Sequence, residues 1–153
     1  MKSKVQILLT FLVVALSTSV FAQDHTNLKK GYGAEGYDVV AYFSNSAVKG
    51  DKKFMTTYEG VNYKFVSAEN LEAFTKNQEK YIPQYGGYCA YAVAVKGEKV
   101  SVDPKTFEIR DNKLYLFYNS WGVNTLEKWT EEGAQKLQQK ADANWRNIVK
   151  KKS

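Results

Sequence analysis

Two segments with turn residues at their centres constrain the fold more than any other feature of this sequence. Residues 61–65 alternate apolar and polar side chains directly after Glu59-Gly60, as expected for a strand with one buried face. A second turn at Asp111-Asn112 precedes residues 113–118, which are apolar on both faces. We therefore expect two β-hairpins, and in the second a central strand that is covered on both sides.

Helical patterns follow each hairpin. Ser67 is suited to cap an amphipathic helix over residues 68–77. Apolar residues keep helical spacing from 126 to 148, and Gly133 is expected to divide that region. Residues 88–95 fit a helix or a strand, and we favour a short helix opening near Gly87. Residues 37–43 suit a buried strand or extended segment, and no internal repeat is evident.

These patterns together predict an α+β fold: a small antiparallel sheet built from hairpins, with a short helix after the first hairpin and C-terminal helices packed on it. Residues 1–22 have the charged start, apolar centre and small residues before the cut that are typical of a signal peptide. We expect a flexible leader at 23–35, one domain at 36–149 and a basic tail at 150–153.

A signal peptide predicts an exported protein, either periplasmic or secreted. An uncleaved membrane anchor is the alternative, but no stable membrane insertion is expected once residues 1–22 are removed. The formal charge of +6 is spread along the chain apart from the basic tail. Nucleic acid is therefore not an expected partner, and any protein partner stays open.

The segment 81–94 is the best site candidate, because it combines the only cysteine with tyrosines and a Gly-Gly pair. A tyrosine-lined pocket suits a small ligand. Asp38 is either a structural acceptor for turn amides or a site carboxylate facing the glycine turn. The expected ligand-binding residues are Asp38, Tyr42, Tyr85, Gly86, Gly87, Tyr88, Cys89 and Tyr91.

A single cysteine forms no disulfide within the chain, so Cys89 is buried, liganded, reactive or paired with another chain. A nucleophilic thiol needs a base, and the only histidine, His25, lies in the expected leader. If the chain starts at Gln23 after cleavage, His25 stands third from the amine, a pattern that chelates Cu(II). Copper or zinc bound by Cys89 and His25 is thus an alternative to ligand binding.

Several motifs give the chain a resemblance to exported, single-domain YHS domain-containing proteins over residues 36–148. They are Gly-Tyr-Asp-x-Val-Ala-Tyr-Phe at 36–43, Tyr-x-Gly-x-x-Tyr-x-Phe-x-Ser-x-x-Asn at 58–70, Pro-Gln-Tyr-Gly-Gly-Tyr-Cys-Ala at 83–90, Asp-Pro at 103–104, Lys-Leu-Tyr at 113–115 and Ala-Asp-x-Asn-Trp at 141–145. The resemblance implies a compact α+β domain, akin to modules found beside metal-transport and metal-sensing proteins, some of which hold a transition metal through cysteines.

The metal-binding cysteines of such relatives correspond here to Ala41, Val66 and Asn70, none of which supplies a thiolate. Our leading interpretation is therefore a non-enzymatic module that binds a small ligand or a partner around Gly86-Gly87 and Cys89. Transition-metal handling is the second interpretation, and a thiol-dependent enzyme is the third.

Overall fold

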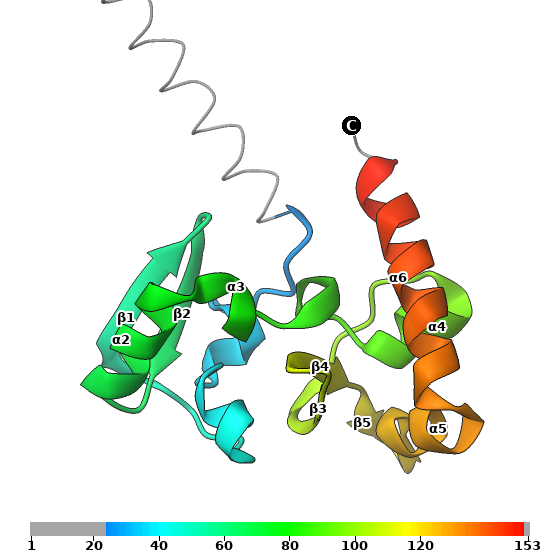
Figure 1. The fold of residues 1–153 in the computed structure, drawn as a ribbon, viewed down its shortest axis with the longest axis horizontal. Helices are drawn as coiled ribbons and strands as arrows, with labels where there is room; N and C mark the ends of the chain where they lie inside the picture. Colours follow the sequence, from blue (N-terminus) through cyan, green and yellow to red (C-terminus); the bar gives the residue numbers. More distant parts are fainter. Residues whose placement is uncertain (1–23, 152–153) are drawn as a thin grey trace, which may run out of the picture.

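A computed structural model describes residues 24–151 and confirms the α+β class (Figure 1). The described part contains three two-stranded antiparallel sheets, β1–β2, β3–β4 and β5–β6, in place of the single sheet expected. The predicted signal peptide lies outside the described residues. In order, the elements are η1 (Gly33–Gly36), η2 (Ala41–Ser44), β1 (Asp51–Tyr58), β2 (Val61–Phe65), α2 (Ala68–Lys76), α3 (Gln78–Tyr81), η3 (Gln84–Gly87), α4 (Ala90–Lys96), β3 (Asp103–Arg110), β4 (Lys113–Phe117), β5 (Asn119–Ser120), β6 (Val123–Asn124), α5 (Thr125–Glu132) and α6 (Ala134–Lys150).

Both predicted hairpins are confirmed, and so are their turns. Glu59 and Gly60 have φ values of 49° and 78°, and Asp111 and Asn112 have 50° and 59°. Two consecutive left-handed residues form the turn that matches the twist of a two-residue hairpin, and glycine, aspartate and asparagine adopt this conformation most readily. The predicted cap is confirmed too, since the Ser67 side chain accepts a hydrogen bond from the Asn70 amide at the start of α2.

The two hairpins have the same register and the same irregularity. Asp51 pairs with Phe65 and Asp103 pairs with Phe117, 52 residues later at both positions. The register then shifts between Asp51 and Met55 in one hairpin, and between Asp103 and Phe107 in the other. Because a bulge at one particular pair is a local feature, its recurrence at the same distance indicates that the hairpins are copies of one structural unit.

The surroundings of the hairpins correspond as well. Left-handed residues at 34–36 precede the first hairpin and left-handed residues at 85–87 precede the second. After these turns, the Asp38 amide donates to the Val48 carbonyl and the Cys89 amide donates to the Val100 carbonyl. The helix that follows the first hairpin contains Asn-Leu-Glu-Ala-Phe at 70–74, and the helix after the second contains Thr-Leu-Glu-Lys-Trp at 125–129. We refer to residues 33–76 as unit 1 and residues 84–132 as unit 2.

This correspondence corrects the expectation that the chain contains no repeat. The spacing between counterparts grows along the chain, from 51 residues at the left-handed turns to 55 at the helices, so no fixed period is visible in the sequence. The counterparts also share conformation more than residue identity. The similarity of the two units is therefore evident from their backbone conformation and strand register but not from their residue types.

Strand β4 lies between the two hydrophobic cores of the molecule. Leu114 and Leu116 belong to the core of unit 1, whereas Tyr115 and Phe117 belong to the core that includes α4 and α6. All four side chains are fully buried. Side chains alternate across a strand, so one strand supplies a wall to each core. The prediction that this strand is covered on both sides is confirmed.

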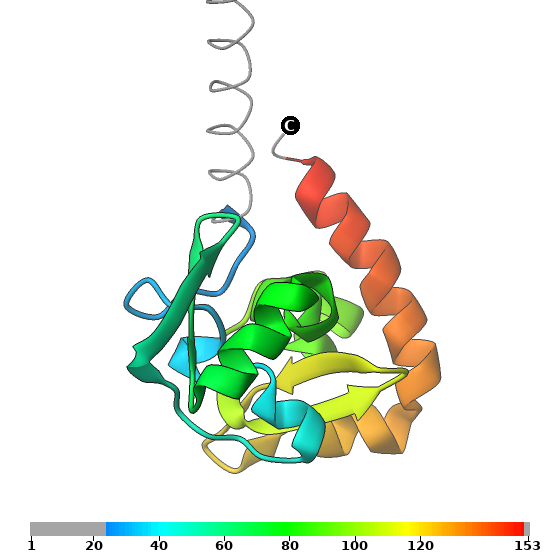
Figure 2. The same cartoon turned by 60° about the vertical axis from the view of Figure 1, so that its left-hand side comes forward.

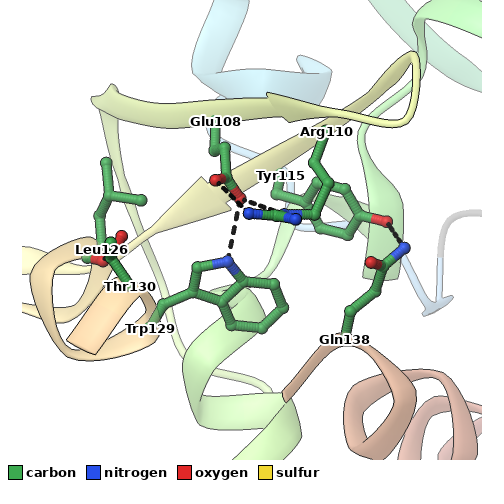
Figure 3. Close-up of polar contacts among 7 residues, drawn as sticks. All are labelled: Glu108, Arg110, Tyr115, Leu126, Trp129, Thr130 and Gln138. Carbon is green, nitrogen blue, oxygen red and sulfur yellow. Dashed lines mark hydrogen bonds and ion pairs between the residues drawn. The ribbon is translucent and has the colours of Figure 1, made fainter. Parts of the chain in front are cut away.

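An aromatic side chain at the same place in each helix fills each core. Phe74 of α2 packs with its ring 5.0 Å from that of Tyr63, and its counterpart Trp129 of α5 lies 5.9 Å from Tyr115. Trp129 is also anchored through its indole N–H, which donates to Glu108 at 2.9 Å (Figure 3). Glu108 in turn accepts two hydrogen bonds from Arg110, and this ion pair orients the carboxylate toward the indole.

Gly133, with a φ of 101°, separates α5 from the long helix α6, as the sequence predicts. Helix α6 covers unit 2, where Leu137 and Ala141 are buried and Gln138 donates to the Tyr115 hydroxyl at 2.8 Å (Figure 3). It stands on the opposite side of the molecule from the β1–β2 hairpin (Figure 2). No helix within residues 24–151 has the length and apolar character needed to cross a membrane.

Residues 37–43 differ from the extended strand that their apolar side chains suggest. The Asp38 carboxylate accepts hydrogen bonds from the amides of Val40 at 2.9 Å and Ala41 at 3.1 Å. These bonds turn the chain at once, and the segment continues as the short helix η2. Side-chain chemistry at one aspartate therefore overrides the strand preference of the valines that follow it.

Residues 24–27, which we call the N-terminal strap, differ from the expected flexible leader. His25 is only 6% exposed. The Asn27 amide donates to the Gly86 carbonyl at 2.8 Å, and the Asn27 side chain donates to the Gly87 carbonyl at 3.2 Å. The strap is held because Asn27 supplies hydrogen-bond donors to the carbonyls of Gly86 and Gly87.

Candidate functional site

A cleft of about 540 Å³ lies between the β1–β2 hairpin and α6. Its floor is the turn η3, including Tyr85 and Gly86, at the end of the segment that links the two units. Residues of the β1–β2 hairpin and residues of α6 both line the cleft. The lining includes Tyr58, Glu59 and Glu79 on one side and Asp142, Trp145 and Arg146 on the other.

The floor is built from a strained backbone. Tyr85 has a φ of 55° and Gly86 has a φ of 60°. A left-handed conformation costs a residue with a side chain about 1–2 kcal/mol, so Tyr85 is held there by its surroundings. A Cβ atom added at Gly86 would collide with the His25 carbonyl oxygen of the strap. Only glycine therefore allows the strap to pass this close to the floor.

The strained turn directs the Tyr85 side chain toward α6, where its hydroxyl donates to the Asp142 carboxylate at 2.7 Å. Burial, reinforced by this hydrogen bond, raises the pKa of Tyr85 well above its usual range. The hydroxyl thus stays protonated and serves as a donor. Asp142 also lines the cleft, and only one of its carboxylate oxygens accepts from Tyr85.

Aromatic rings and charges surround the floor. The Trp145 ring lies 6.0 Å from the Tyr85 ring and 6.3 Å from the Tyr88 ring. Exposed charges of both signs line the rim: Glu59, Glu79, Lys113 and Arg146. None of these four takes part in an ion pair within residues 24–151. Flat rings beside unpaired charges form a surface suited to a small polar ligand that carries a ring.

Cys89 lies outside this cleft. It directly precedes α4, its side chain is fully buried, and its sulfur is 3.3 Å from the Thr125 hydroxyl oxygen. The Thr125 hydroxyl donates its single hydrogen to the Tyr118 carbonyl at 2.8 Å. Cys89 is therefore the donor in its contact with Thr125. A thiol that is fully buried and held in this contact lacks the accessibility that a nucleophile or a metal ligand needs.

Asp38 and Tyr42 lie in the core of unit 1 rather than in the cleft. Besides the two turn amides, Asp38 accepts from the Val66 amide at 2.9 Å and from the Asn70 side chain at 2.8 Å, and it is fully buried. These four bonds occupy both carboxylate oxygens, which is the arrangement of a structural acceptor. Tyr42 donates to the Pro104 carbonyl at 2.6 Å, and burial raises its pKa well above the usual range.

The remaining predicted residues occupy three different surroundings. Gly87 packs near Pro83. The Tyr88 hydroxyl donates to the Thr26 carbonyl of the strap at 3.4 Å. Tyr91 donates to Glu132 at 2.6 Å, and this hydrogen bond raises the pKa of Tyr91 to about 12. The structure therefore brings Tyr85 and Gly86 together at the cleft, places Cys89 and Tyr91 at a second groove, and keeps Asp38 and Tyr42 in the core.

The donors expected for copper or zinc make other contacts in this structure. The His25 Nδ1 atom lies 3.0 Å from the Lys99 ammonium, which only donates hydrogen bonds, so that nitrogen is the acceptor. A metal cation at Nδ1 would have to displace the positive charge of Lys99. Within residues 24–151, no three His, Cys, Asp or Glu side chains are grouped as a metal site requires. Gln23, the other end of the proposed copper motif, lies outside the described residues.

Sequence reasoning did not select Asp142, Trp145 and Arg146 as site residues. Positions 142, 145 and 146 have the i, i+3, i+4 spacing that places them on one helix face. The apolar spacing along the same helix predicted only which of its faces is buried. The Ala-Asp-x-Asn-Trp motif at 141–145 contained the signal, since it pairs an acid with an aromatic residue at that spacing.

Residues 39–85 match the family model of the YHS domain. The matched segment covers most of unit 1 and ends at Tyr85 on the floor of the cleft, so nearly all of unit 2 lies beyond it. No curated protein and no solved structure gives a significant match to the chain.

Proposed function

We propose that this chain, whose residues 39–85 match the YHS domain, is a non-enzymatic binding module that holds a small organic ligand in the cleft between the β1–β2 hairpin and α6. One observation carries the proposal: a buried tyrosine, kept in a strained left-handed conformation, forms the cleft floor and donates to Asp142. Strain of this kind persists where the surrounding structure fixes it, and it gathers at ligand sites.

The chemical class of the ligand follows from the residues that line the cleft. Trp145 and the tyrosines offer ring faces, and the rim offers both signs of charge. We propose a ligand with a flat ring that carries one or more charged substituents. An anionic substituent would pair with Arg146 or Lys113, and a cationic one with Glu79 or Glu59. The volume of about 540 Å³ falls within the range of small-molecule sites.

The test uses three probes that share one ring and differ in charge: indole-3-acetate, tryptamine and tryptophan. We expect at least one probe to shift the amide NMR signals of Tyr85, Gly86 and Arg146 in a saturable manner. Indole-3-acetate should lose affinity in Arg146→Gln but not in Lys140→Gln, which removes a charge from the same helix outside the cleft lining. If no probe binds, or if the signals that move lie elsewhere, the proposal is wrong.

Metal handling is the activity often linked to the YHS family. It is the alternative for this chain, with Cys89 and His25 as the donors. The geometry supports it less than ligand binding, because Cys89 donates to Thr125 and the His25 Nδ1 faces an ammonium group. Titration with Cu(II) and Zn(II) tests it. Stoichiometric binding that disappears in Cys89→Ala or His25→Ala would place metal handling first.

The third interpretation, a thiol-dependent enzyme, needs a Cys89 that reacts rapidly with iodoacetamide in the folded protein.

We also propose that the protein is exported and that its leader is removed after Ala22. The support is the charged start and apolar centre of residues 1–22. N-terminal sequencing of the protein recovered from outside the cytoplasm should then begin at Gln23. An intact Met1 on the exported protein would argue for a retained anchor.

A further inference from the structure

A second groove, of about 390 Å³, lies in unit 2 beside α4 and the β5–β6 hairpin. Apolar side chains dominate its walls, and they include Val95, Val100 and Val123. Val95 and Val123 are 41% and 39% exposed, which places them among the few large apolar side chains that the described residues leave open to solvent. Exposed apolar groups that converge on one hollow indicate an apolar occupant.

Comparison of the two units shows that this groove is a feature of unit 2. In unit 1, α2 begins at Ala68, directly after β2 ends at Phe65. In unit 2, the β5–β6 hairpin is inserted between β4 and α5, and it contributes Val123 to the groove. The insertion therefore adds a wall that unit 1 does not have.

The contact beneath the groove also differs between the units. In unit 1, Asp38 bonds to Asn70 at 2.8 Å and to three backbone amides. The counterparts in unit 2 are Cys89 and Thr125, whose side chains meet at 3.3 Å and line the groove. An ionised carboxylate would be costly beside an apolar ligand, whereas a protonated thiol behaves as a small apolar side chain. The residue under the groove is thus compatible with an apolar occupant.

The charged side chains that line the groove are both lysines, Lys96 and Lys128. Both are exposed, and neither takes part in an ion pair within residues 24–151. The counterpart of Lys128 in unit 1 is Ala73, so this charge also belongs to unit 2 alone. Positive charge at the edge of an apolar groove complements an anionic head group on an apolar chain.

We propose that this groove binds a free long-chain carboxylate, with the alkyl chain against the valines and the carboxylate beside Lys96 and Lys128. The occupant is a single amphiphile in solution rather than a bilayer surface. The groove volume lies within the range of small-molecule sites and is separate from the cleft of the proposed function. Either site can therefore be present without the other.

The test is calorimetric titration of the protein without residues 1–22, using decanoate below its micellar concentration. We expect saturable binding, weakened about fivefold in the double variant Lys96→Gln/Lys128→Gln, because both charge pairings with the carboxylate are lost. The matched control is Lys136→Gln/Lys140→Gln, which removes two exposed charges from α6 and should leave the affinity unchanged.

Charge reversal gives a second readout. Lys96→Glu/Lys128→Glu should bind decyltrimethylammonium, which has the same chain, in preference to decanoate. The proposal is overturned if decanoate does not bind, if the wild-type protein binds both amphiphiles equally, or if the double glutamine variant keeps full affinity. Binding to phosphatidylglycerol vesicles without binding to decanoate would also overturn it and would indicate a membrane-docking surface.

Discussion

Asp38 and Cys89 occupy equivalent positions in the two units, yet their side chains need very different numbers of hydrogen-bond partners. A buried carboxylate needs donors on both oxygens, and unit 1 provides four of them. A buried thiol needs few hydrogen-bond partners, and in unit 2 the Thr125 hydroxyl is its partner. The same place in the fold is thus a rigid polar junction in one unit and a small apolar contact in the other.

We predict that Asp38→Ala lowers the free energy of unfolding by at least about 3 kcal/mol, because four donors lose a charged acceptor at once. Cys89→Ala should cost about 1 kcal/mol, since it removes one weak hydrogen bond and one sulfur atom. Urea unfolding followed by circular dichroism measures both values. Asp51→Ala is the control for an exposed aspartate and should change stability by less than about 1 kcal/mol. Equal effects at positions 38 and 89 would contradict this account.

At the scale of elements, the hairpins and the capped helix α2 were predictable because their signals are local. A turn dipeptide, an alternating pattern and a capping serine each act within a few residues. The turn at Gly86-Gly87 was expected, but the left-handed conformations of Ala34, Glu35 and Tyr85 were not predictable, since these residue types disfavour them. The strap was missed for a related reason: its partners lie some 60 residues away in the sequence.

Gly86→Ala should detach the strap, because the new Cβ atom meets the His25 carbonyl oxygen. We expect the Asn27 amide, which donates to Gly86, to exchange its hydrogen much faster in this variant. Gly122→Ala is the matched control: its φ of +74° imposes the same kind of strain, but no atom lies within 4 Å of the added Cβ. That control should cost about 1 kcal/mol and leave Asn27 protected. Equal exchange rates in the two variants would show that the strap does not depend on Gly86.

At the scale of the whole molecule, sequence reasoning located part of the candidate site but not its opposite wall. Tyr85 and Gly86 were selected because tyrosines and glycines cluster there, and both line the cleft. Asp142 and Arg146 come from a helix more than fifty residues later, and only the packing of α6 beside η3 brings them to the same place. Cys89 was drawn into the same predicted site by its nearness in sequence, whereas the start of α4 directs it to a separate groove.

The buried tyrosines predict how the stability of the molecule depends on pH. Burial raises the pKa values of Tyr42, Tyr63 and Tyr85 above the value of about 10 expected in the unfolded chain. Because folding favours the neutral form, the stabilisation is fully present below about pH 10 and is lost as the pH rises above it. The free energy of unfolding should therefore stay level from about pH 8 to 9 and then fall.

Urea unfolding across this range gives the slope, and tyrosinate absorbance reports ionisation. We expect these tyrosines to ionise together with unfolding rather than one by one in the folded protein. Tyr42→Phe should lower stability at every pH, since it removes the bond to Pro104, but its stability should fall less steeply above pH 10. A wild-type protein that ionises all its tyrosines while remaining folded would refute this prediction.

Strand β4 also determines whether the two units can be separated from each other. Its leucines complete the core of unit 1, while its tyrosine and phenylalanine complete the core of unit 2. A chain cut between the units would leave the first one without a wall of its core, although each unit has its own hairpin and helix. The two units therefore resemble each other in form but share a strand between their cores, so we expect them to unfold together rather than one at a time.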